Sequence, residues 1–286
     1  LTQVEGRSFF QIQRDRQFSQ ELQLVSKKTS GFDWMLGVFY WNAKGQFDPF
    51  ELRIRGIVGN PLFNLITGNP YQTSESIAPY GQATYEFLPD TNLTLGARYT
   101  WETRKVGGEQ RLVAPNGTQF GPTILAPIPK ASFGSFTWRA SLDHKFSRDA
   151  MVYVSYNRGF KSGGFSVLEF TAPPYRPETI DAYEAGWKTT LFDGKATFNG
   201  AAFYYDYRDV QVYGLSQFGL VISNGGKGWI KGAEFEFSAR PTSQLTLTAA
   251  YTYLDSKWLS YPNASINTPN PAGGKVQTTG PVVGNQ

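Results

Sequence analysis

The chain has 286 residues, and its 27 Lys and Arg against 23 Asp and Glu give a net charge of +4. Aromatic residues make up 16% and charged residues 17% of the sequence, whereas disordered chains have few aromatic residues and more charge. The mean hydropathy is −0.36, and no apolar run approaches the roughly 20 residues of a membrane-spanning helix. Composition therefore excludes a disordered chain and a helical membrane protein.

Two residue types that commonly build reactive sites are scarce. Cysteine is absent, and His144 is the single histidine. Disulfides, cysteine-ligated zinc, cysteine nucleophiles and two-histidine sites are thereby excluded. The positive charges are scattered and form no Lys/Arg block of the kind that contacts nucleic acid. We expect no metal centre, no cofactor and no nucleic-acid partner.

Alternation of apolar and polar residues dominates the chain. In Leu93–Thr103, Leu, Ala, Tyr and Trp alternate with Thr, Gly, Arg and Glu, and Leu245–Tyr253 and Ala233–Ala239 repeat the pattern. Successive side chains of a strand point to opposite faces, so each segment has one apolar and one polar face. The pattern predicts ten strands and no helix of useful length. In chain order the strands span residues 17–26, 32–41, 76–87, 93–103, 134–146, 151–159, 178–191, 196–212, 222–240 and 245–257.

The expected connections are alternately short and long. Short turns are predicted at 27–31, 88–92, 147–150, 192–195 and 240–244, and Asp193-Gly194 is a strong hairpin signal because it accepts positive φ. Long connections are predicted at 42–75, 104–133, 160–177 and 213–221. This order predicts an antiparallel up-and-down meander, unlike the Greek key of most sandwiches.

The strands are longer than the 5–6 residues or so of an average soluble strand, and about 9–11 residues suffice to cross a bilayer at a tilt. Short turns on one side and long loops on the other are typical of outer-membrane barrels. The fold class predicted is therefore all-β, an antiparallel up-and-down transmembrane β-barrel, with a soluble sandwich or propeller as the alternative. An aromatic girdle is expected where strands meet the long loops, at Tyr40, Trp41, Tyr99, Trp101, Tyr251, Tyr253 and Trp258.

Eight segments, in this order, carry a family resemblance: Phe18–Leu24, Trp34–Tyr40, Tyr80–Tyr85, Leu93–Tyr99, Tyr153–Phe165, Pro177–Glu178, Tyr183–Lys188 and Lys231–Glu236. Together they resemble the barrel of TonB-dependent outer-membrane receptors. The resemblance implies a plugged barrel of about 22 strands in the bacterial outer membrane. Residues 1–286 are then expected to be part of one barrel domain, with the N-terminal plug, the early strands and the final strand absent.

The resemblance also implies a function. Family members import a scarce nutrient, and a ferric siderophore is the first expectation. Cobalamin, heme, plant-derived aromatic compounds and oligosaccharides remain open. The implied partners are the TonB complex, reached through the absent plug, outer-membrane lipid and lipopolysaccharide, and a small-molecule metal chelate. A passive porin and a structural or adhesive surface protein are the rival interpretations.

The expected outer loops are rich in Arg, Lys and Tyr. Arg offers a planar fork for carboxylate or catecholate oxygens, and Tyr gives rigid contact at little cost in entropy. Ordinary solvation of the loops, or contact with anionic surface glycolipid, explains the same residues. The candidate ligand-binding residues are Arg53, Arg55, Tyr71, Arg104, Lys105, Arg111, Lys161, Tyr175, Arg176 and Tyr213.

Charged residues also recur in the polar phase of the predicted strands, where a hydrated or plug-filled lumen accepts charge that lipid rejects. Ion pairs with a plug, solvation of the wall and cross-strand pairing all explain them. The candidate lumen-facing residues are Arg98, Glu102, Arg139, Asp143, Glu184, Lys188, Glu234 and Glu236.

His144 tests whether the chain is an enzyme. A catalytic histidine needs a nucleophile or carboxylate partner, but the neighbouring Asp143 is expected on the opposite face of the same strand. His144 also lies next to a short turn, away from the outer loops. We therefore expect a passive histidine and no catalysis.

Overall fold

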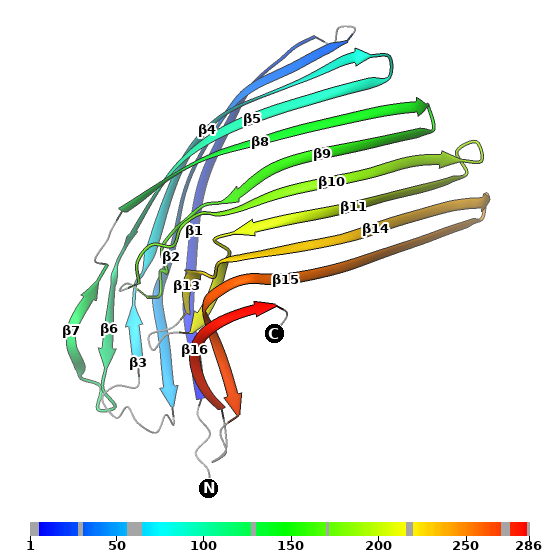
Figure 1. Cartoon of the computed structure of the whole chain (residues 1–286). Coiled ribbons are helices and arrows are strands. Elements are labelled where there is room, and N and C mark those ends of the chain that lie inside the picture. Colours follow the sequence, from blue (N-terminus) through cyan, green and yellow to red (C-terminus); the bar gives the residue numbers. More distant parts are fainter. Residues whose placement is uncertain are drawn as a thin grey trace.

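The protein is an all-β chain with antiparallel strand pairing throughout. The computed structural model describes residues 6–27, 31–55, 65–126, 130–169, 172–215, 220–269 and 275–284. These residues form one 14-stranded sheet and a separate two-stranded hairpin. Figure 1 shows the sheet as a curved wall, with the short turns gathered at one end of the long strands. Among the described residues, no helix is long and apolar enough to cross a membrane.

Ten long strands build the wall, as predicted. Each pairs with the next along the chain in the order β1-β2-β4-β5-β8-β9-β10-β11-β14-β15, so the up-and-down meander is confirmed. Their bounds are β1 Gly6–Val25, β2 Phe32–Arg55, β4 Tyr71–Leu88, β5 Thr91–Gly107, β8 Lys130–Ser147, β9 Ala150–Lys161, β10 Glu178–Leu191, β11 Ala196–Arg208, β14 Lys227–Thr242 and β15 Leu245–Pro269.

Six further strands lie outside the ten predicted ones or only overlap them. β3 Leu65–Gly68, β6 Glu109–Val113 and β7 Gln119–Leu125 lie in predicted long connections. β12 Gln211–Leu215 and β13 Leu220–Asn224 each overlap the end of a predicted strand, and β16 Lys275–Gly284 follows the last one. Two predicted boundaries were wrong for the same reason. The predicted strand 222–240 joins the end of β13 to β14 across Gly226, which has φ +134°, and the predicted strand 196–212 runs past the end of β11 at Asp209, φ +52°.

Four of the five short turns lie where the sequence predicted them, and most of the fifth, predicted at 27–31, is outside the described residues. Asp193 and Gly194 both have positive φ, 55° and 86°, and Phe192 joins them at 55°. The loop between β10 and β11 is therefore longer than a two-residue hairpin turn. Asp90 takes the left-handed conformation in the turn between β4 and β5, with φ +59°. Asp tolerates this conformation better than most residues.

Cross-strand register divides the sheet into two faces. Tyr183 pairs directly with Tyr156 and Tyr204, whereas the adjacent Glu184 pairs with Ser155 and Phe203. Direct partners share a face. We call the face with Tyr183 the apolar face, because it presents exposed side chains such as Leu95, Val154, Phe237, Leu247 and Tyr251. The opposite, polar face contains Glu184, as the interior of a membrane barrel does.

The aromatic girdle is partly confirmed. Register places Tyr40, Tyr99, Trp101, Tyr251 and Tyr253 on the apolar face. Trp41 lies on the polar face, because it pairs with Ser76, which in turn pairs with Glu102. Trp258 also lies there, because it pairs with Gly228, which is in phase with Glu234 on β14. Consecutive residues of a strand cannot share a face, so Tyr40 and Trp41 could not both have belonged to one girdle.

Several glycines make room for an aromatic ring on the next strand. Gly186 pairs with Tyr153, and Gly200 pairs with Trp187. A Cβ at Gly186 would lie 2.7 Å from the Tyr153 hydroxyl, and one at Gly200 would lie 2.5 Å from the Trp187 ring. Such rings cover the bare backbone of a cross-strand glycine and help to fix register.

Candidate ligand site on the polar face

The eight lumen-facing candidates occupy the polar phase of β5, β8, β10 and β14. Four of them have partners on the same face. Asp143 accepts a hydrogen bond from Asn92 at 2.9 Å, Glu184 accepts one from the Tyr153 hydroxyl at 2.7 Å, and Arg98 Nε donates to Thr100 at 3.2 Å. Glu102 pairs with Arg104 at 2.6 Å.

The other four candidates carry charge that the described part of the chain does not neutralise through an ion pair. They are Arg139, Lys188, Glu234 and Glu236. Lys188 and Glu236 both pair through backbone with Asn199, so they lie in one cross-strand row. The polar face of this wall thus presents charges of both signs that are open to an external partner.

The connection between β9 and β10 folds over the outer part of the polar face. Its described residues are 162–169 and 172–177. Gly164 and Tyr175 bridge the two limbs with backbone hydrogen bonds of 3.1 and 2.9 Å. Phe165 packs on buried Val106 of β5, and Leu168 packs on the buried cluster around Phe50. We call this segment the folded connection.

Three glutamines from separate strands bind the folded connection. Gln110 Nε2 donates to the Leu168 carbonyl at 2.9 Å, and Gln72 Oε1 accepts from the Phe165 amide at 3.3 Å. Gln211 Nε2 donates to the carbonyls of Ser162 at 2.9 Å and Arg176 at 3.2 Å. These contacts satisfy backbone groups that burial would otherwise leave unpaired. The Ser162 hydroxyl beside them is buried without a partner among the described residues.

Arg104 of β5 lies beside Tyr175 of the folded connection. The Arg104–Glu102 pair is largely covered, with side-chain exposures of 18% and 9%. Tyr175 is buried beside it, and burial raises the pKa of the Tyr175 phenol while the Arg104 guanidinium opposes the shift. Two of the ten predicted ligand-binding residues therefore lie together on the polar face, where Glu102 neutralises the charge of Arg104.

The remaining ligand-binding candidates are dispersed. Lys161 ends β9 just before the folded connection, whereas Arg176 lies within it and pairs with Asp209. Tyr213 lies on β12 with 69% of its surface exposed. Arg55 ends β2, but its side chain lies outside the described part of the structure.

Arg53, Tyr71, Lys105 and Arg111 occupy the other face. Leu52 and Gln110 contact the folded connection on the polar face, so their strand neighbours Arg53 and Arg111 point to the opposite face. Lys105 follows Arg104, and Tyr71 pairs with Gly107 in the phase of Lys105. Arg53 and Arg111 form ion pairs with Glu51 and Glu109, respectively. The structure therefore does not bring these four residues to Arg104 and Tyr175.

His144 and Asp143 point to opposite faces. His144 Nδ1 lies 2.8 Å from the Thr91 hydroxyl, whereas Asp143 contacts Asn92. Within the described chain, no three His, Asp or Glu side chains gather in a way that could hold a metal ion. The Asp143 carboxylate therefore does not orient the His144 ring.

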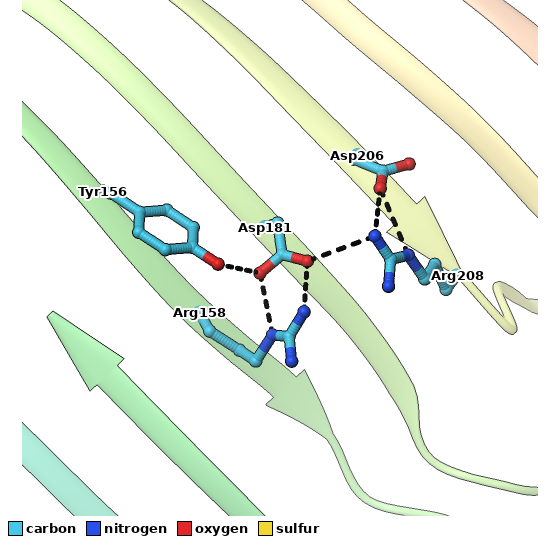
Figure 2. Close-up of polar contacts among 5 residues, drawn as sticks. All are labelled: Tyr156, Arg158, Asp181, Asp206 and Arg208. Atoms are coloured by element: carbon cyan, nitrogen blue, oxygen red, sulfur yellow. Dashed lines mark hydrogen bonds and ion pairs between the residues drawn. The ribbon is translucent and has the colours of Figure 1, made fainter.

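A charged cluster on the apolar face was missed by the sequence analysis. Figure 2 shows Arg158 of β9, Asp181 of β10, and Asp206 and Arg208 of β11 joined by hydrogen bonds and ion pairs. Arg158 Nε donates to Asp181 Oδ1 at 2.7 Å, and Tyr156 donates to the same oxygen at 3.0 Å. Arg208 lies 3.6 Å from Asp181 and 2.8 Å from Asp206. Asp181 itself is only 3% exposed.

Aromatic rings surround this cluster. The Arg158 guanidinium lies 4.4 Å from the Trp138 ring centroid, and Tyr156 stacks on Tyr183 at 4.7 Å. Asp181 is the eleventh residue of β10 counted from its turn end, Leu191. A tilted strand crosses the bilayer in about 9–11 residues. The cluster therefore lies where the strands leave the lipid, beside rings suited to a membrane interface.

The curved sheet, its apolar outer surface and its polar inner surface define the wall of a membrane β-barrel. Residues 2–285 match the family described as "TonB dependent receptor-like, beta-barrel". The chain therefore belongs to the TonB-dependent receptor family, whose members are outer-membrane β-barrel proteins.

Named relatives agree with this assignment. The chain is 21% identical to the pesticin receptor of Yersinia enterocolitica over 232 residues, which cover 79% of this chain and 32% of that protein. It is 27% identical to the metal-pseudopaline receptor CntO of Pseudomonas aeruginosa over 121 residues, 42% of this chain and 17% of that protein. The chain thus spans at most about a third of these relatives' length.

Solved structures share the fold. The ferric yersiniabactin uptake receptor FyuA from Yersinia pestis aligns with a TM-score of 0.72 and 20% identity, over 88% of this chain and 37% of that one. The ferric-catecholate import receptor Fiu from E. coli aligns with a TM-score of 0.65 and 16% identity, over 86% and 38%. The all-β membrane-barrel class predicted from alternation is confirmed.

Proposed function

We propose that the complete receptor imports a ferric siderophore across the outer membrane and that TonB energises this import. The observation that carries the proposal is the match of residues 2–285 to the TonB-dependent receptor barrel, on whose polar face Arg104 and Tyr175 lie together at the outer ends of the strands. Guanidinium groups suit the carboxylate or catecholate oxygens of a chelate. The names of the relatives, which include receptors for ferric yersiniabactin and ferric catecholates, support the same cargo class.

In this proposal residues 1–286 form part of one barrel whose remaining strands and plug lie outside this chain. The plug contacts the polar face, and TonB acts through the plug. Arg139, Lys188, Glu234 and Glu236 are the proposed plug contacts, because their charges have no ion-pair partner in the described chain. The apolar face contacts lipid, and its outer margin contacts lipopolysaccharide. Iron enters as cargo inside its chelate.

Uptake of radioactive iron tests the proposal. The gene is deleted from its host, and the full-length receptor is returned on a plasmid. Accumulation of siderophore-bound iron from iron-starved culture medium is then measured with and without a protonophore. We expect the receptor to restore accumulation and the protonophore to abolish it. Accumulation that persists without a proton gradient would indicate a passive channel, and unchanged accumulation after deletion would indicate a structural or adhesive role.

A charge variant tests the plug contact separately. The double substitution Glu234→Gln and Glu236→Gln removes two charges from the polar face and keeps side-chain size. We expect lower uptake at unchanged receptor abundance, because the proposed ion pairs with the plug are lost. The matched control is Asp255→Asn, which removes a carboxylate from the apolar face of the neighbouring strand. Equal uptake by both variants would contradict the proposed plug contact.

A further inference from the structure

One cross-strand row near the outer ends of β11, β14 and β15 sets a glycine between two aromatic residues. Tyr207 pairs with Gly228, and Gly228 pairs with Trp258. The row belongs to the polar face, in phase with Phe203, the partner of Glu184. Trp258 is the fourteenth residue of β15, beyond the roughly 9–11 that cross the bilayer. The row therefore lies in the outer mouth, on the side where a ligand arrives.

A cavity of about 220 Å³ opens at this row. The residues of the row line it together with Val210, Trp229 and Ile230, and Ser256 and the backbone carbonyl of Lys257 add polar groups. An apolar cavity of about 150 Å³ is large enough to bind benzene. The volume therefore suits one substituted aromatic ring, and its lining of rings and aliphatic groups with few polar atoms is typical of a small-molecule site.

Gly228 differs from the other cross-strand glycines that face an aromatic residue. At Gly186 and Gly200 the partner's ring covers the glycine so closely that a Cβ would lie 2.7 or 2.5 Å from it. At Gly228 a Cβ would lie 3.0 Å from the backbone carbonyl oxygen of Lys257, but the nearest atom of the Trp258 ring, Cε3, would be 3.6 Å away, which is ordinary contact distance. The Trp258 ring thus stands beside Gly228 without occupying the space above it, and it packs on Tyr261 with centroids 5.0 Å apart.

Sheet geometry makes this space a slot for a ring. Neighbouring strands lie about 4.8 Å apart, so the backbones of Tyr207 and Trp258 lie about 10 Å apart. Aromatic rings pair with centroids about 4.5–7 Å apart. A ring placed over Gly228 therefore reaches pairing distance of the aromatic residues on both sides at once.

We propose that Tyr207, Gly228 and Trp258 form a subsite for an aryl arm, a phenolate or catecholate ring, of the imported chelate. The inference rests on the proposed function, and it narrows the cargo to chelates with an aromatic arm as against those built from aliphatic hydroxamates.

Equilibrium binding to the purified full-length receptor in detergent tests the subsite. The probes are metal-free 2,3-dihydroxybenzoate, its ferric complex, and ferric acetohydroxamate, which has no ring. We expect the ferric aryl complex to bind at least tenfold more tightly than ferric acetohydroxamate. Trp258→Ala should weaken both aryl probes at least tenfold and leave acetohydroxamate binding unchanged. Gly228→Val, which fills the slot, should have the same effect.

Tyr253→Ala is the matched control, because it removes an exposed ring of β15 from the apolar face. Equal binding of aryl and hydroxamate complexes, or equal losses in Trp258→Ala and Tyr253→Ala, would overturn the subsite. The metal-free probe separates the two proposals. Aryl binding that depends on Trp258 in a receptor that imports no iron would refute the proposed function alone, whereas iron import by a receptor without aryl binding would refute the subsite alone.

Discussion

Replacing Asp181 by Asn tests whether the charged cluster on the apolar face holds the outer ends of three strands together. The Asp181 carboxylate accepts hydrogen bonds from Tyr156 at 3.0 Å and from both Nε and Nη2 of Arg158, with Nε at 2.7 Å. Arg208 adds an ion pair at 3.6 Å. Asn keeps the shape and one acceptor oxygen but presents an amide donor to a guanidinium group, so at least one hydrogen bond is lost together with the charge.

The magnitude follows from burial. A hydrogen bond to a charged group contributes about 1.5–3 kcal/mol, and breaking a fully buried ion pair costs about 3–5 kcal/mol. The Asp181 side chain is 4% exposed, but that of Arg158 is 27% exposed, so water partly solvates the guanidinium that is left behind. We therefore expect Asp181→Asn to lower the free energy of unfolding by about 2–3 kcal/mol.

Equilibrium urea unfolding of the full-length receptor in lipid vesicles measures this loss. Asp255→Asn is the control, because the Lys231–Asp255 pair lies on the same face at 3.4 Å with side-chain exposures of 52% and 33%. Exposed pairs contribute less than about 1 kcal/mol. A double-mutant cycle with Arg158→Ala isolates the pair from other effects of each substitution. Equal losses in Asp181→Asn and Asp255→Asn, or a coupling energy near zero, would refute the reasoning.

Three further perturbations concern the folded connection and the sheet. Gln211→Ala removes buried hydrogen bonds worth about 1–2 kcal/mol, so subtilisin should cleave the folded connection about 5–30 times faster, whereas Gln119→Ala, in an exposed hairpin, should leave the rate unchanged. Gly186→Ala places a Cβ 2.7 Å from a backbone carbonyl oxygen and should lower the free energy of unfolding in urea by about 1–3 kcal/mol. Gly96→Ala is the control, because the nearest atom to a Cβ there is 3.5 Å away and the free energy of unfolding should hardly change. Burial raises the pKa of Tyr175 from 10.0, so the folded connection should stay packed on the polar face below pH 10 and loosen as the pH rises through the folded-state pKa. Subtilisin should then cleave this connection faster in the wild type but not in Tyr175→Phe.

Alternation predicted the wall because one physical cause governs every long strand. A side chain that faces lipid must be apolar, and its neighbour must face the lumen, so period two recurs wherever a strand crosses the bilayer. The short strands of the connections lack this constraint. Gln110 resembles an ordinary polar loop residue, yet it is only 2% exposed because Leu168, far away in the sequence, covers it. Contacts between segments distant in the sequence produce no local alternation, so the short strands could not be predicted from it.

The candidate site shows a second limit and one missed signal. Residue type alone selected both Arg104 and Lys105, although adjacent strand residues necessarily face opposite ways. Both belong to the predicted connection 104–133, but β5 continues to Gly107, and the structure places only Arg104 beside Tyr175. Conversely, Arg158 and Asp181 interrupt the apolar phase of their strands, and this interruption was visible in the sequence.

The interruptions occur at a nearly constant distance from the short turns. Counted from the turn, the first acidic or basic residue in the apolar phase is the ninth residue in β9, Arg158. It is the eleventh in β10, β11 and β15, namely Asp181, Asp206 and Asp255, and the twelfth in β14, Lys231. Crossing the bilayer at a tilt takes about 9–11 residues, so on these five strands charge appears where lipid ends. Moving the wall inward would bury these charges in hydrocarbon, at about 2–4 kcal/mol for each Arg or Lys carried to the midplane. The charged margin therefore opposes inward displacement, and it keeps the folded connection and the Tyr207–Gly228–Trp258 row above the membrane, where a chelate is captured.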